Sequence, residues 1–258
     1  MATVRVIARL DIKGEHLIKG IQMEGLRKLG NPSEFAKKYY ADGIDEIIYM
    51  DSVASLYGRA AILDILRRTT EDVFVPITVG GGIRCIDDVQ QTLRAGADKV
   101  AVNTAALCRP ELLREIAETF GTQCLVLSIE AKQTHVDRWE AYTDSGRERS
   151  GIDVMEWAAQ GSALGVGEIL LTSVDRDGTR KGFDADLISR VAQVVSIPVI
   201  ASGGFGEPVH LVEAVRKGHA DAVAIGSALH YGAFSVADIK AGVTNQGIYV
   251  RSVVPCVV

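Results

Sequence analysis

The hydrophobic residues of the chain follow two alternating patterns. Short runs rich in β-branched residues, typical of buried strands, recur eight times. They lie at residues 4–11, 46–51, 75–82, 98–103, 124–130, 168–173, 197–202 and 221–226. Between them the apolar residues have helical spacing, for example in the stripe formed by Leu112, Leu113, Ile116, Ala117 and Phe120.

This alternation predicts the fold class. Asn31-Pro32 and Arg109-Pro110 place proline where a first helical turn accepts it. A strand followed by a helix, eight times in 258 residues, indicates a (β/α)8 TIM barrel, in the α/β class. A doubly wound open sheet is the alternative, and it would need an edge pair that the pattern does not show. We expect one domain over residues 1–250, followed by a tail at 251–258 that is too short to span a membrane.

The two halves of the chain resemble each other. Gly81-Gly82 recurs as Gly203-Gly204 at an offset of 122 residues, and residues 97–105 recur at 220–228 at an offset of 123. Such regular spacing predicts two half-barrels of four strand–helix units each, with no linker between them.

Composition narrows the class of protein. The chain is 47% hydrophobic, which is typical of a globular protein and excludes a disordered or fibrous one. Its net charge of −5 argues against a nucleic-acid binder that depends on basic charge.

The cysteines and the N-terminus indicate the compartment. Cys85, Cys108, Cys124 and Cys256 form no CxxC pair and have no histidine at metal-ligand spacing, so we expect free thiols, no metal and no cofactor. The first apolar stretch contains charged residues such as Arg5, so we expect neither a signal peptide nor a membrane span. These features predict a cytoplasmic protein.

The loops after the strands should meet at one rim, which we call the mouth. Small residues there leave backbone N–H groups exposed at helix starts, where an anion can bind. We expect a first cradle formed by Gly81, Gly82, Asn103 and Thr104, and a second formed by Ser202, Gly203, Gly204, Gly226 and Ser227. A single glycine pair could simply make a tight turn, but two symmetric copies favour two phosphate sites on opposite sides of the mouth.

Carboxylates also end the strands. Asp11 and Glu130 occupy equivalent places in the two halves, 119 residues apart, so we expect them to face each other. A carboxylate pair in different environments can divide general acid and general base work. A single strand-end acid would more simply cap a helix or be solvated, but the symmetric placement favours catalysis.

Six motifs resemble one family. They lie at residues 10–11, 19–20, 78–84, 95–100, 168–179 and 197–204 and resemble the cyclase subunit of imidazole glycerol phosphate synthase, from histidine biosynthesis. The resemblance covers about residues 4 to 245. It implies a lyase that receives ammonia from a glutaminase subunit in a heterodimer. The implied substrate is a bis-phosphorylated formimino-aminoimidazole carboxamide ribonucleotide, and the implied products are imidazole glycerol phosphate and aminoimidazole carboxamide ribonucleotide.

The resemblance also implies residue roles. Asp11 matches one catalytic residue, and Glu130 stands where the family usually has a second catalytic aspartate. Lys19 resembles a substrate-loop residue. Three further residues complete the expected substrate-binding set: Asp51, Thr172 and Asp177.

Four charged residues match the family's ring at the far end of the barrel, through which ammonia is thought to enter. They are Arg5, Glu46, Lys99 and Glu168, which we call the charged ring. Two cations and two anions at strand starts can alternate in a closed ring, and the alternative to an ammonia entrance is a purely structural salt-bridge layer. The resemblance implies that the glutaminase docks on this face.

Two positions depart from the family. Arg9 replaces a small residue, and Glu130 replaces aspartate. Alternation along the first strand places Arg9 on the inward face if Asp11 faces inward. A buried arginine needs a carboxylate, so we expect Glu130, one methylene longer, to reach down to Arg9 and to have its pKa lowered. Arg9 is also expected to narrow an ammonia passage.

Three functions therefore remain open. The first is the histidine-pathway cyclase. The second is a paralogue that passes ammonia to another acceptor, such as a sugar amidotransferase, and the departures at Arg9 and Glu130 favour it. The third is a non-catalytic scaffold that binds a phosphorylated ligand.

Overall fold

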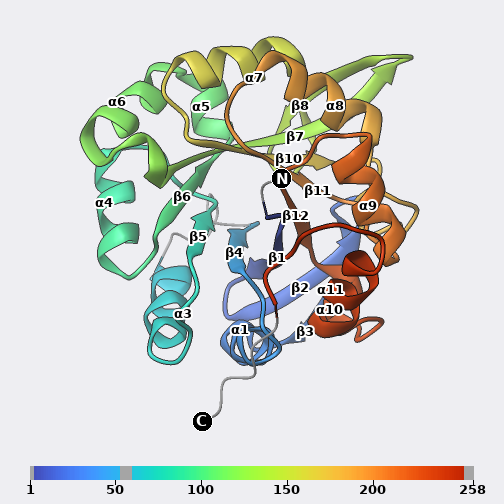
Figure 1. Ribbon diagram of the computed structural model, residues 1–258. Coiled ribbons are helices and arrows are strands. Elements are labelled where there is room, and N and C mark those ends of the chain that lie inside the picture. Colours follow the sequence, from blue (N-terminus) through green and yellow to red (C-terminus); the bar gives the residue numbers. More distant parts are fainter. Residues whose placement is uncertain (1–2, 53–59, 253–258) are drawn as a thin grey trace.

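Eight parallel strands close into a barrel in the computed structural model, which describes residues 3–52 and 60–252 (Figure 1). The eighth strand pairs with the first, and pairing between β6 and β7 joins the two halves in the middle of the chain. The barrel strands are β1 (Arg5–Lys13), β4 (Glu46–Asp51), β5 (Ile77–Gly80), β6 (Lys99–Val102), β7 (Leu125–His135), β10 (Glu168–Ser173), β11 (Val199–Ser202) and β12 (Ala222–Ile225). The predicted TIM barrel is confirmed, and each expected strand run overlaps one of these strands.

Helices surround the barrel, as Figure 1 shows. They are α1 (Pro32–Ala41), α3 (Ala60–Thr70), α4 (Ile86–Arg94), α5 (Thr104–Cys108), α6 (Glu111–Phe120), α7 (Val154–Ala163), α8 (Ala185–Val194), α9 (Pro208–Arg216), α10 (Ser227–His230) and α11 (Val236–Thr244), with a 3-10 turn at η1 (Thr122–Cys124). Helix α1 begins at Pro32, where the Asn31 side chain accepts a hydrogen bond from the Ser33 N–H. In α6 the predicted stripe faces the core, since Leu112 and Ile116 are buried.

Each half carries an antiparallel hairpin that the hydrophobic pattern did not predict. Strands β2 (His16–Ile21) and β3 (Glu24–Gly30) extend β1, while β8 (Arg138–Thr143) and β9 (Glu148–Asp153) extend β7. The glycine-punctuated segment from Gly14 to Gly30 is therefore a paired hairpin. Both hairpins follow the strands that carry Asp11 and Glu130, so each overhangs the mouth.

The interior of the barrel is layered. Inward residues of β1 alternate from Arg5 through Ile7 and Arg9 to Asp11, and all but the partly exposed Arg5 are buried. The middle layer is a separate apolar cluster made of Ile7, Ile48, Ala101, Val126, Leu170, Ile200, Ala222 and Ala224. This layer separates the charged ring at the strand starts from the polar mouth at the strand ends.

The segment around Val250 returns to the barrel. Val250 forms an isolated parallel bridge with Val4, while residues 253–258 of the expected tail lie outside the described residues. Cys85, Cys108 and Cys124 carry free thiols, and Cys256 lies in the part not described. Among the described helices, none has the length and apolarity needed to cross a membrane.

Candidate active site

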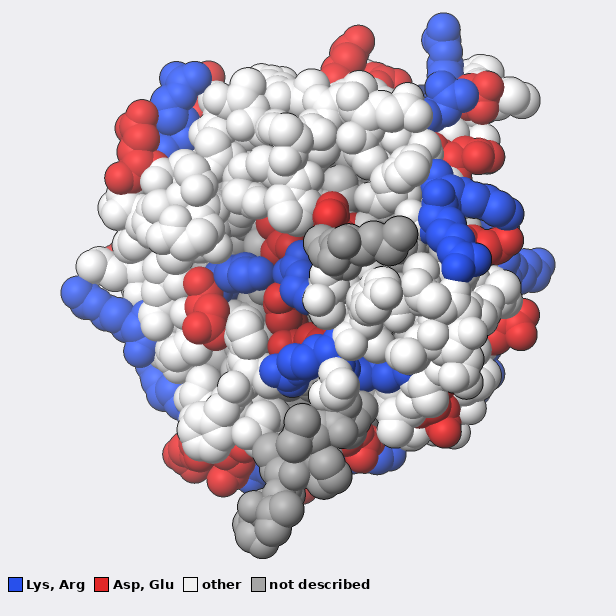
Figure 2. Space-filling view, viewed as in Figure 1, with Lys and Arg blue, Asp and Glu red and all other residues white. Residues whose placement is uncertain are grey.

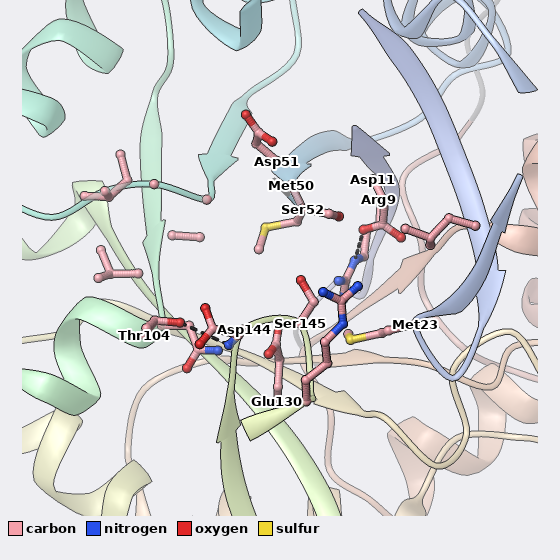
Figure 3. A pocket seen from close by; sticks show the side chains of 18 of the residues that line it. Arg9, Asp11, Met23, Met50, Asp51, Ser52, Thr104, Glu130, Asp144 and Ser145 are labelled. Atoms are coloured by element: carbon pink, nitrogen blue, oxygen red, sulfur yellow. Dashed lines mark hydrogen bonds and ion pairs between the residues drawn. The ribbon is translucent and has the colours of Figure 1, made fainter. Parts of the chain in front are cut away.

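The mouth holds a pocket at the C-terminal ends of β1, β4, β5, β6 and β7. All four residues of the first cradle line it, together with Asp11, Lys19, Asp51 and Glu130. In Figure 3 the side chains of Asp51 and Asp11 lie on one side of the open centre, and Thr104 and Glu130 lie opposite. The two carboxylates expected to face each other therefore share one pocket.

A second, smaller pocket lies at the ends of β11 and β12. All five residues of the second cradle line it, along with Asp177. Of the residues that line the two pockets, Arg9 and Lys19 line both. The structure thus brings both predicted cradles to one mouth and divides them by two cationic side chains.

Symmetric glycines shape the two cradles. Gly81 has φ +93° and Gly203 has φ +92°, which are left-handed conformations that favour glycine. A Cβ atom on Gly81 would lie 2.2 Å from the Asp51 carbonyl oxygen, and one on Gly203 would lie 2.6 Å from that of Ser173. Both positions therefore require glycine, because the backbone of the neighbouring strand leaves no room for a side chain.

Four buried side chains form a network between the pockets, and we call it the buried ion-pair network. Arg9 Nε donates to Asp11 Oδ1 at 2.9 Å, and Lys19 Nζ donates to Asp11 Oδ2 at 3.1 Å. Lys19 Nζ also donates to both carboxylate oxygens of Asp177, at 3.0 and 2.9 Å. Two cations and two anions balance, so the network satisfies charges that would be costly to bury alone.

The two candidate catalytic carboxyls differ in their electrostatics. Burial opposes ionisation of Asp11, but the charges of Arg9 and Lys19 outweigh it and hold the pKa of that carboxyl well below its usual range. Burial raises the pKa of Glu130 to about 7, against the smaller opposing effects of the Arg9 charge and the Gly146 N–H. One carboxylate is thus held ionised, while the other can gain or lose a proton near neutral pH.

The expected ion pair between Arg9 and Glu130 is wrong. Arg9 does face inward, but its guanidinium bonds to Asp11, which lies two residues along the same strand and so on the same face. Glu130 Oε2 instead accepts a hydrogen bond of 2.8 Å from the Gly146 N–H in the β8–β9 turn. The expected lowering of the Glu130 pKa is also wrong, because that hairpin helps bury the carboxyl and was not foreseen.

The rest of the Arg9 guanidinium reaches across the barrel. Nη1 donates to Thr172 Oγ1 at 2.7 Å and to Ser202 Oγ at 3.1 Å. Thr172, expected to bind substrate, is fully buried beneath the guanidinium and lines neither pocket. The Thr172 hydroxyl, which was expected to bind a ligand, instead accepts a hydrogen bond from the Arg9 guanidinium.

Several residues of the mouth escaped the sequence analysis. Arg84 and Arg147 line the larger pocket, and Asp144 and Ser145 reach it from the β8–β9 turn with positive φ values. Arg84 ends the motif at residues 78–84, so its position after the glycines was a usable signal. Arg147 had no such signal, because its place depends on the unpredicted hairpin.

A buried histidine supports the network from behind. His230 Nε2 lies 2.9 Å from the Arg9 carbonyl oxygen, and Nδ1 lies 2.7 Å from the Tyr39 hydroxyl. Since a carbonyl only accepts, Nε2 carries the proton and Nδ1 accepts from Tyr39. Burial and the nearby Lys19 charge lower the pKa of His230 to about 4.

The charged ring closes at the opposite end of the barrel as predicted. Arg5 bonds to Glu46 at 2.7 Å and also to Glu168, while Lys99 bonds to the same two carboxylates at 3.3 and 2.9 Å. Figure 2 shows acidic and basic side chains gathered at the centre of the face seen in Figure 1. The ring thus alternates in charge around the barrel axis.

Comparisons with known proteins agree with this geometry. A family model described as "Histidine biosynthesis protein" matches residues 5–235. Three relatives bear the name imidazole glycerol phosphate synthase subunit HisF. The one from Legionella pneumophila is 62% identical over 207 residues, covering 80% of this chain and 98% of the relative. Those from Mycobacteroides abscessus and Corynebacterium diphtheriae are each 49% identical, over 253 and 255 residues, covering 96% of this chain and 98% of each relative.

The matched region runs from the first strand of the barrel to the turn before α11, and so contains both cradles, the buried ion-pair network and the charged ring. Fold, site and sequence likeness therefore agree that the chain belongs to the histidine biosynthesis protein family.

Proposed function

We propose that this chain is an imidazole glycerol phosphate synthase cyclase subunit. It uses ammonia to convert a bis-phosphorylated formimino-aminoimidazole carboxamide ribonucleotide to imidazole glycerol phosphate and aminoimidazole carboxamide ribonucleotide. The observation that carries the proposal is the pair of glycine-lined cradles on either side of one mouth, which suits a ligand with a phosphate at each end.

The residues of the mouth have roles in this proposal. The first cradle binds one phosphate with help from Arg84 and Arg147, and the second cradle binds the other. Glu130 and Asp11 supply the acid–base and electrostatic groups between them. Lys19 and Asp177 lie where the middle of a spanning ligand would pass.

A relative that is named a subunit implies a complex, and we propose that the partner is a glutaminase forming a heterodimer. The charged ring is the proposed entrance for ammonia, and its face is the proposed docking surface. We also propose a cytoplasmic location, because free thiols are typical of a reducing compartment and the proposed reaction belongs to small-molecule metabolism.

The test is turnover by the purified chain. The bis-phosphorylated ribonucleotide is mixed with an ammonium salt at pH 8, and both products are quantified. The proposal expects both products in equal amounts, and Gly81→Ala and Gly203→Ala each to raise the KM for the ribonucleotide. Tight binding of the ribonucleotide without any product would contradict it.

Arg9 favours a second candidate function. Its guanidinium ties up Asp11 and crosses the barrel between the charged ring and the mouth. A barrel with this obstruction could serve the second function, in which ammonia goes to another acceptor such as a sugar amidotransferase. Incorporation of glutamine nitrogen into a sugar by the complex, with no cyclase turnover, would select that alternative.

A further inference from the structure

Arg9 is held rigidly inside the barrel. Its three hydrogen bonds reach Asp11 on β1, Thr172 on β10 and Ser202 on β11, so the guanidinium is fixed from three strands. The side chain is only 7% exposed. A planar cation in such a site has little freedom to move away from its carboxylate.

Both carboxylate oxygens of Asp11 are held by cations. Oδ1 accepts from Arg9 and Oδ2 accepts from Lys19, and Lys19 is itself held by both oxygens of Asp177. Protonating Asp11 would give up two ion pairs and leave Arg9 and Lys19 short of negative charge in a buried site.

Glu130 is arranged differently. Oε2 accepts from the Gly146 N–H, whereas Oε1 has no hydrogen bond to any residue of the described ranges. Glu130 also lines the larger pocket. One oxygen is therefore fixed for orientation, and the other is available to a molecule in the pocket.

We propose that Arg9 is a positioning residue that fixes Asp11 as a permanent anion, so that Glu130 alone exchanges protons with a ligand in the larger pocket. The proposal deepens the function proposed above, because it assumes that this mouth is a reaction site. It replaces the expectation that Asp11 and Glu130 divide the general acid and general base work between them.

Charged groups from every side of the site enter this assignment. Glu130 faces the Arg9 and Asp11 charges from β1 and Asp144 from the β8–β9 turn, and Arg147 lines the same pocket. The cation favours the ionised form of Glu130 and the two anions favour the protonated form. Asp11 faces the two cations Arg9 and Lys19, and both of them favour its ionised form.

Carboxyl ¹³C NMR of the full chain, titrated from pH 4 to 9, tests the proposal without any ligand. Resonances are assigned with Glu130→Gln and Asp11→Asn. We expect the Glu130 carboxyl to titrate near neutral pH and the Asp11 carboxyl to show no titration in this range. In Arg9→Met the Asp11 carboxyl should begin to titrate at the acid end of this range, because a neighbouring arginine usually lowers the pKa of a carboxyl by about 1 to 3 units.

Arg5→Met is the matched control, because it removes a guanidinium from the same strand two layers below. It should leave the Asp11 signal unchanged. Arg9→Lys, which keeps the charge but loses the planar geometry, replaces Arg9→Met if the latter does not fold, and should shift Asp11 in the same direction by a smaller amount. Titration of Asp11 between pH 4 and 9 in the wild type, or an Asp11 carboxyl that shows no more titration at the acid end in Arg9→Met than in the wild type, would overturn the proposal.

A kinetic measurement adds a functional readout and separates the two proposals. Where the bis-phosphorylated ribonucleotide and ammonium salt give turnover, Glu130→Gln should lower kcat at least about 100-fold. It should also remove the change in kcat near pH 7 that the pH–rate profile of the wild type is expected to show. A pH–rate profile of Glu130→Gln that keeps the change in kcat near pH 7 would overturn the inference. If the wild type gives no turnover, the cyclase proposal fails, while the NMR titration still decides the state of Asp11.

Discussion

At the scale of single residues, burial decides how the charged groups behave. Glu130 and His230 are both buried, and each is pushed toward its neutral form. Their effects on stability oppose each other between about pH 4.5 and 6.5, because the folded state holds an extra proton on Glu130 and lacks one on His230. Single substitutions should separate the two effects.

Glu130→Gln should stabilise the protein at alkaline pH. The pKa of Glu130 is about 7 in the folded state and 4.5 unfolded, so wild-type stability from this group falls as pH rises from about 4.5 to 7. The glutamine has no charge to bury, so at pH 8 its free energy of unfolding should exceed that of the wild type by up to about 3 kcal/mol. Urea unfolding at pH 5 and pH 8 measures this, and an equal difference at both pH values would contradict it.

His230→Gln should have its effect on the acid side. The pKa of His230 is about 4 in the folded state and 6.5 unfolded, so its contribution to stability is complete above about pH 6.5 and is lost as pH falls toward 4. The wild type should therefore lose up to about 3 kcal/mol more than His230→Gln between pH 7 and pH 4. Parallel stability curves for the two proteins would show that folding does not lower the pKa of His230.

At the scale of elements, the two half-barrels should have equivalent cradles. Gly81→Ala and Gly203→Ala each force a Cβ against the backbone of a neighbouring strand, so each should distort one cradle. Phosphate titrations followed by ³¹P NMR should show two sites in the wild type and one in each variant. Gly151→Ala, with φ +77° and open space around the Cβ, is the control that has backbone strain without a clash. Loss of both sites in either variant would contradict independent cradles.

The elements could be predicted where the local pattern determines them. The eight barrel strands follow from apolar runs such as residues 168–173, because parallel strands are buried on both faces. The hairpin β2–β3 escaped because half of its residues are exposed and its turn is punctuated by positive-φ residues such as Gln22 rather than by a recognisable motif. The hairpin β8–β9 escaped because β9 has no buried residue to form an alternating pattern, and because its turn contains the positive-φ residues Asp144 and Ser145.

The site could likewise be predicted only where the topology of the barrel determines it. The cradles and the placement of Asp11 and Glu130 at strand ends follow from topology alone. The partner of Arg9 could not be predicted in this way, because the reach and direction of a long side chain depend on the local backbone. They also depend on competing donors, such as the Gly146 N–H that bonds to Glu130 in place of Arg9. Period-two alternation nevertheless contained the answer, since Arg9 and Asp11 share one face of β1.

At the scale of the whole molecule, the barrel axis joins two charged regions through an apolar layer. The charged ring lies at one end and the buried ion-pair network at the other. Removing one member of either set leaves buried charge without its partner, which makes both sets important for stability.

Arg5→Met tests the ring as a stability element. Glu46 and Glu168 would then share only Lys99, and the two carboxylates would repel each other in a mostly buried site. The free energy of unfolding should fall by about 3 kcal/mol, and adding Glu46→Gln should recover part of the loss. A double variant less stable than Arg5→Met would contradict this account of the ring.

The central claim is that one ligand spans both cradles across the buried ion-pair network. A crystal structure of the Glu130→Gln variant with the bis-phosphorylated ribonucleotide tests it most directly. The account predicts one phosphate against Gly82 and Thr104, the other against Gly204 and Ser227, and the middle of the ligand beside residue 130. A ribonucleotide with both phosphates in a single pocket, or bound outside the mouth, would contradict it.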